Sequence, residues 1–80
     1  MAEFVDGAAF RAESVTPSDT VDFKAPARGL YVGSAGNVVV VNMDGSTVTF
    51  TAVPAGAILP TRARRVNASS TTASSIVAFF

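Results

Sequence analysis

The clearest pattern of hydrophobic and polar positions lies at residues 37–52, where two runs rich in β-branched residues flank Asp44 and Gly45. Asp-Gly accepts positive φ at both central positions of a tight turn, so this pattern predicts a β-hairpin. A two-residue turn fixes the register, because each step back along one strand is matched on the other. The expected cross-strand pairs are Met43 with Ser46, Val41 with Val48 and Val39 with Phe50.

In this register the residues of these three pairs face the core, and the opposite face of the hairpin carries both apolar and polar side chains. It is too apolar to be simply solvated and too rich in hydroxyl groups for a sealed core, which suits a contact between subunits. The residues on it are Val38, Val40, Asn42, Thr47, Thr49 and Thr51. A three-residue loop with a bulge at Gly45 is the alternative. It would pair Val40 with Val48 and exchange the faces of the first strand.

Alternating or β-branched segments bounded by Gly, Pro, Ser and Asp recur along the rest of the chain. They predict strands at residues 21–24, 29–33, 61–66 and 76–80, with Val21, Phe23, Leu30 and Val32 pointing inward and Tyr31 outward. The prolines at both ends of residues 54–60 argue against a central strand there, so this segment is expected to be a connection with Ile58 and Leu59 as an apolar plug. The sequence therefore predicts an all-β fold, a small antiparallel β-sandwich or barrel of about six strands.

The first fifteen residues have neither a clean period of two nor a full amphipathic helix, and Gly7 interrupts them. We expect an extended N-terminal arm over residues 1–15 and a single β domain over residues 16–80. Phe4 and Phe10 would anchor the arm on a neighbouring surface, because two exposed phenylalanines favour association. The alternative is a first strand or a short helical turn on the domain's own core.

The composition indicates that the domain is stabilised by contacts with other chains. With 80 residues it buries a smaller fraction of its surface than a larger domain does, and it has no cysteine or histidine for a disulfide or a zinc site. Hydrophobic residues make up 49%, charged residues 15%, and the mean hydropathy is +0.41. Oligomerisation or docking on a larger body is therefore expected.

Charge and hydropathy argue against nucleic acid and membrane partners. Six basic and six acidic residues give a net charge of zero, which does not steer the chain toward polyanions. The longest aliphatic run, residues 38–41, is far shorter than the roughly 20 apolar residues of a membrane helix. The amino-terminal residues are acidic where a signal peptide would be basic, so synthesis in a cytoplasm is expected.

No residue set of the sequence points to catalysis, a metal or a cofactor. Without histidine or cysteine the familiar triads and zinc sites are excluded, and Lys24 is the only lysine available to serve as a base. Asp19 and Asp22 are close in sequence, but such residues after a proline more often satisfy the backbone of a turn than bind an ion. The chain is therefore expected not to be an enzyme.

Three arginines, Arg62, Arg64 and Arg65, lie within four residues. They could bind phosphates, clamp carboxylates of a partner subunit, or form a solvated strand face. Because the net charge is zero, the protein–protein interpretation is preferred for Arg62 and Arg64. Phe80 is a further expected contact residue, because the two phenylalanines that end the sequence are expected to lie against an apolar surface.

The order of motifs resembles the small β-rich proteins encoded with the head genes of tailed bacteriophages and of gene transfer agents. The resemblance covers residues 16–78 and rests on residues 16–20, 27–33, 36–40, 53–60, 64–66, 71–73 and 76–78. One departure is Ser70, which stands where the family has a glycine just before Thr-Thr-Ala.

The resemblance implies a structural virion protein on the outer surface of the capsid, a cement or decoration protein bound to the major capsid protein. The alternative within this class is the base of a head spike or fibre at capsid vertices. A homo-oligomer is expected, a trimer for cement or a pentamer for a spike base, with a head fibre protein as a further candidate partner. A carbohydrate- or receptor-binding module is the alternative of another class, but such sites favour exposed aromatics, and this chain has no Trp and one Tyr.

Overall fold

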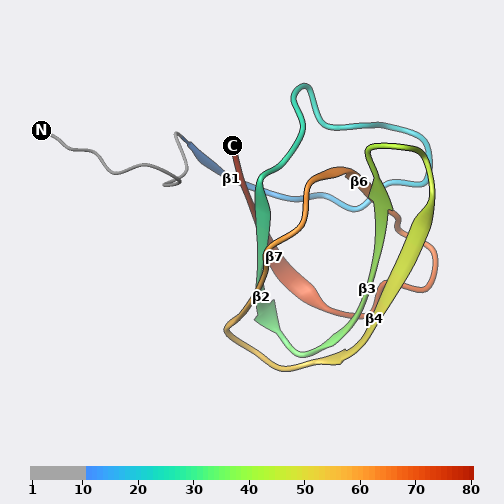
Figure 1. Cartoon of the computed structure of the whole chain (residues 1–80). Coiled ribbons are helices and arrows are strands. Elements are labelled where there is room, and N and C mark those ends of the chain that lie inside the picture. Colours follow the sequence, from blue (N-terminus) through green and yellow to red (C-terminus); the bar gives the residue numbers. More distant parts are fainter. Residues whose placement is uncertain (1–10) are drawn as a thin grey trace, which may run out of the picture.

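The computed structural model describes residues 11–80, which fold into two antiparallel β-sheets without a helix in that range (Figure 1). The all-β fold predicted from the sequence is confirmed, with seven strands in place of about six. The strands are β1 (Ala12–Ser14), β2 (Gly29–Ser34), β3 (Gly36–Asn42), β4 (Thr47–Val53), β5 (Ala57–Leu59), β6 (Ala63–Val66) and β7 (Ser74–Phe79). One sheet has the order β1-β7-β2-β5, and the other has the order β4-β3-β6.

The core lies between the two sheets and is built from alternate residues of their strands. Leu30 and Val32 of β2 and Ile76 and Ala78 of β7 meet side chains from β3 and β6 in one cluster. Among residues 11–80 no polar or charged residue is buried, so the interior is wholly apolar. Tyr31 is 37% exposed between the fully buried Leu30 and Val32, as its alternation predicts.

The hairpin of β3 and β4 has the bulged register, so the predicted two-residue turn is wrong. The Asn42 N–H donates to the Ser46 carbonyl (2.7 Å) and the Gly45 N–H donates to the Asn42 carbonyl (3.0 Å), which closes a loop over Met43, Asp44 and Gly45. Gly45 has φ +91°, the left-handed conformation that the last position of such a loop requires.

This register exchanges the faces of β3. Val40 pairs with Val48, and Val38 pairs with Phe50. Val38 and Val40 are fully buried in the core (0% exposed), so their predicted place on an outward subunit contact is wrong. Thr47 and Thr49 do lie on the opposite face and are exposed.

Two other segments differ from the predicted strands. Residues 21–24 form no strand, and Val21 is 68% exposed, although Phe23 packs partly against the core. Residues 57–59, expected to be a connection, form the edge strand β5 beside β2, with Leu59 buried and Ile58 exposed. The prolines at positions 54 and 60 flank β5, and a short edge strand tolerates them because it needs donors on one side only.

At the other edge of this sheet, β1 pairs with β7, and Arg11 and Phe80 extend that pairing. Part of the segment expected to be an arm thus lies in the sheet. Phe4 and Phe10, its expected anchors, lie outside the described residues.

Candidate interaction surfaces

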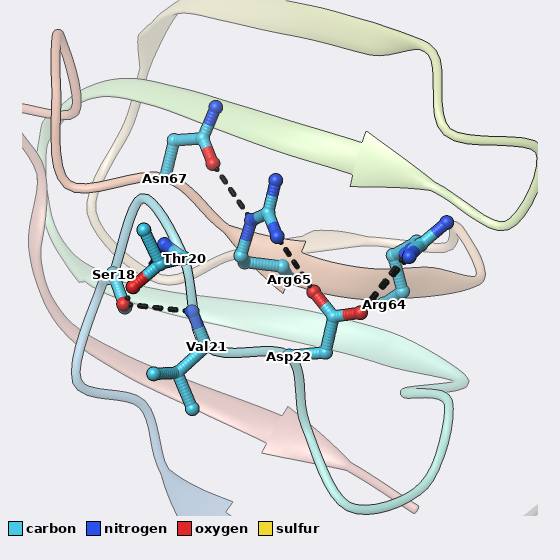
Figure 2. A network of polar contacts seen from close by, with 7 residues as sticks. All are labelled: Ser18, Thr20, Val21, Asp22, Arg64, Arg65 and Asn67. Carbon is cyan, nitrogen blue, oxygen red and sulfur yellow. Dashed lines mark hydrogen bonds and ion pairs between the residues drawn. The ribbon is translucent and has the colours of Figure 1, made fainter.

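Asp22 binds two of the three neighbouring arginines (Figure 2). Its Oδ2 accepts from Nε (3.1 Å) and Nη2 (3.0 Å) of Arg64, and its Oδ1 accepts from Nη1 of Arg65 (2.8 Å). Arg65 also donates from Nε to Oδ1 of Asn67 (3.0 Å). The carboxylate therefore ties the loop of residues 18–23 to β6, and Arg64 is engaged within the domain.

A bulge in β6 makes this arrangement possible. Arg65 pairs with Val41 and Ala63 pairs with Asn42, so Arg64 is the extra residue between them. Because of this extra residue, Ala63 and Val66 both point into the core although three positions separate them. Arg62 precedes β6 and is exposed.

The same loop is shaped by Ser18 and held by Asp19. The Ser18 hydroxyl accepts from the N–H groups of Thr20 (3.2 Å) and Val21 (3.0 Å), which turns the chain and leaves the Val21 side chain outside. Asp19 accepts from the hydroxyl (2.7 Å) and the N–H (2.9 Å) of Ser69. These hydrogen bonds, the hydroxyl bond first, lower the pKa of Asp19 below the usual aspartate value.

The Thr71-Thr72-Ala73 segment holds the start of β3, where β6 no longer pairs with it. The Thr72 hydroxyl accepts from the Asn37 N–H (2.9 Å), and the Thr71 hydroxyl accepts from the Val39 N–H (3.0 Å). The Asn37 carbonyl accepts from the N–H groups of Thr72 (2.9 Å) and Ala73 (3.1 Å). The motif thus replaces a strand partner of β3, which is a structural role.

Asn37 also stabilises a bulge in β4. Its Oδ1 accepts from the N–H of Ala52 (2.9 Å), a residue with φ +56°. The register between β3 and β4 shifts at this point, so Ala52 lies at the extra position of β4. One asparagine side chain therefore supports a backbone conformation that alanine rarely adopts.

An apolar row crosses the outer face of the first sheet. Tyr31 pairs with Ile58 on one side and with Val77 on the other, so the three side chains share this face. Ile58 is 60% exposed and Val77 is half-buried. Sequence reasoning placed Tyr31 outward but missed its neighbour Ile58, because residues 57–59 were expected to form an inward plug.

Phe80 lies within the domain, beside the first sheet. Its ring stands edge-on to Phe23 (centroids 5.8 Å apart, interplanar angle 88°), and the Arg11 guanidinium carbon lies 5.0 Å from its centroid. Phe80 exchanges backbone hydrogen bonds with Arg11 and is half-buried. Only part of this side chain is available to a partner.

Within residues 11–80 no group of three or more His, Cys, Asp or Glu side chains is placed to hold a metal ion. No helix in this range is long and apolar enough to span a membrane. The surfaces that the described residues offer to a partner include the apolar row, the exposed threonines of β4 and the exposed Arg62.

These features define a small all-β domain with contact surfaces. No protein-family model and no curated protein matches the chain. A solved structure does match it, a chain described as "Capsid of native GTA particle computed with C5 symmetry", where GTA is a gene transfer agent. The two chains are 39% identical, the match covers 99% of this chain and 92% of that chain, and the TM-score is 0.84.

At this identity and coverage the chain belongs to the same family as that component of a GTA capsid particle. The expected resemblance to capsid-associated proteins of gene transfer agents and phages is confirmed at this level.

Proposed function

We propose that this chain is a non-enzymatic structural protein on the outer surface of a tailed-phage or gene-transfer-agent capsid, where it binds the major capsid protein as a cement protein. The observation that carries the proposal is the 39% identity over 92% of a chain found in a GTA capsid. Relatives this similar over nearly their whole length share the fold.

The architecture supports a role in binding a partner rather than in catalysis. Asp22 and Asn37 fix the loops by hydrogen bonds, so the surface is held in one shape before it meets a partner. The row of Tyr31, Ile58 and Val77 offers an apolar contact on the outer face of the first sheet. Contiguous exposed apolar patches mark protein contacts, whereas single exposed apolar residues are common on any surface. We assign this row to the contact with the major capsid protein.

Binding to undecorated capsids tests the proposal directly. The purified chain should sediment with capsids and raise the temperature at which they open. Ile58→Asp places a charge in the apolar row and should weaken sedimentation with capsids, because a desolvated, unpaired carboxylate is unfavourable.

Met43→Asp is the matched control, since Met43 is 47% exposed at the tip of the hairpin, away from the row. This variant should bind as the wild type does. A wild-type chain that does not bind capsids would contradict the cement role. Equal binding by both variants would contradict the assignment of the row while leaving the role intact.

The other predicted contact residues differ in whether their side chains are free to contact another chain. Thr47, Thr49 and Arg62 are exposed, whereas Arg64 is bound to Asp22. Thr47, Thr49 and Arg62 remain candidates for contacts between copies of the chain. Labelling of intact particles by a reagent that does not enter capsids would test the outer location.

The second candidate function is the base of a head spike or fibre at the vertices. It is favoured by the C5 symmetry with which the related GTA capsid was computed, because a pentamer on a vertex shares a five-fold axis with the capsid. A spike base would be present in a few copies at vertices, and cement in copies comparable in number to the capsid protein. Quantitative mass spectrometry of purified particles separates the two.

A further inference from the structure

Four strand edges bound the two sheets, and three of them are protected. β1 and β5 have three residues each, β1 contains Glu13 next to Arg11, and prolines flank β5. The edge of β6 is covered by the loop of residues 18–23, whose Ser18 and Phe23 N–H groups donate to the carbonyls of Val66 (2.9 Å) and Arg64 (2.8 Å). Short length, charge, proline and covering loops are the usual ways in which proteins block edge strands.

β4 differs from these edges. It has seven residues, contains no charged residue, and pairs with β3 alone among the described strands. Its bulge at Ala52 leaves residues 47–51 as a regular edge that no other segment of residues 11–80 covers. Such an edge is a template for the addition of another strand.

The hydrogen-bond pattern shows which backbone groups are directed outward. Asn42 bonds to Ser46, and alternation then directs the N–H and C=O groups of Val48 and Phe50 toward β3. Val39, opposite Thr49, uses its own N–H and C=O on Thr71 and Asn67 instead. The backbone groups of Thr47, Thr49 and Thr51 therefore point away from the sheet.

The side chains of β4 are complementary to those of a second β4. Val48 and Phe50 lie on the core side, and Val48 is still 44% exposed because none of the described strands lies beyond it. Threonines alternate with them on the outer side. Since β4 contains no charge, an antiparallel copy would bring no like charges together.

We propose that β4 is a strand-addition site whose partner is β4 of a second copy of this chain, paired antiparallel about a two-fold axis at Thr49. Thr49 then faces its equivalent, and Thr47 faces Thr51 of the other copy, so that all outward backbone groups find partners. Val48 faces Phe50 of the other copy on the core side, and each covers exposed apolar surface of the other. The two three-stranded sheets become one continuous sheet across the axis.

The test is made on the isolated chain without capsids, so its outcome is independent of the cement role. Native mass spectrometry and light scattering should find a dimer. Thr49→Pro removes an outward N–H at the centre of the pairing, and Thr49→Lys brings two like charges face to face; both should give monomers with wild-type circular dichroism. Thr49→Val keeps the N–H and the branched shape, and it should remain a dimer.

If Thr49→Pro does not fold, Thr49→Lys decides the question. A dimer that survives in Thr49→Lys overturns the proposal, as does a wild-type chain that is a monomer, a trimer or a pentamer. Loss of the dimer in the Thr49→Val control would also overturn it, because the contact would then depend on the hydroxyl rather than on strand pairing.

Discussion

Ser70 has a left-handed backbone conformation with φ +68°, and Ser70→Gly should stabilise the domain. The left-handed conformation is unfavourable by about 1–2 kcal/mol for a residue with a Cβ atom. Glycine removes this cost. It also raises the conformational entropy of the unfolded chain, which favours the unfolded state by about 0.5–1 kcal/mol. The Ser70 side chain is exposed and makes no hydrogen bond to the described residues, so nothing else is lost. The midpoints of these two terms leave a net gain of about 0.75 kcal/mol, which raises Tm by about 3–6 °C in a domain of this size.

The neighbouring Ser69→Gly is the matched control. It gives the unfolded chain the same freedom but removes the hydroxyl that donates to Asp19, so its Tm should fall. Thermal unfolding followed by circular dichroism, at one fixed protein concentration, measures both variants. If Ser70→Gly melts at or below the wild-type temperature while Ser69→Gly melts lower still, backbone strain at Ser70 is not the controlling term.

Three further changes test the interior and the loops. Val40→Lys places a charge at a fully buried position and should prevent folding, as seen by loss of the β-sheet circular dichroism signal; a folded variant would contradict the bulged register. Gly36→Ala would bring a Cβ within 2.5 Å of the Ala73 backbone nitrogen, and urea unfolding should show a loss of about 1–3 kcal/mol; a neutral result would show that the two segments are farther apart. Because the Ser69 hydrogen bonds lower the folded-state pKa of Asp19, they stabilise the fold above the usual aspartate pKa of about 4, and this contribution is lost as pH falls through the lowered value. Asp19→Asn should therefore show a smaller decrease of Tm on acidification than the wild type, and an equal decrease would contradict the linkage.

The sequence predicts the fold class well because turn residues and alternation are local signals. The strand at residues 29–33 and the outward Tyr31 follow from alternation between glycines, and both are found. The register of the hairpin did not follow from alternation. All four valines of residues 38–41 are buried, so the pattern is the same on both faces and does not select between turns of two and three residues.

Other differences arise from contacts between segments that are distant in sequence. Residues 21–24 alternate like a strand, but Asp22 is bound by Arg64 and Arg65, and Phe23 bonds to the edge of β6 as part of a covering loop. Ile58 was expected inside because its segment is apolar, yet pairing with Tyr31 turns it outward. Neither partner can be identified from spacing along one chain, because both depend on how the sheets are assembled.

The place of β7 has a consequence for synthesis of the protein. This strand, the last one along the sequence, lies between β1 and β2 in the first sheet. On the ribosome, β1 therefore has no neighbour, and the core lacks Ile76 and Ala78, until the end of β7 has emerged. The first sheet therefore cannot be completed strand by strand from β1, and its assembly must wait for the synthesis of β7. Until then the valines of β3 lack their core partners in β7 and can associate with other nascent chains. The yield of folded protein is therefore expected to depend on the rate of translation and on the supply of chaperones.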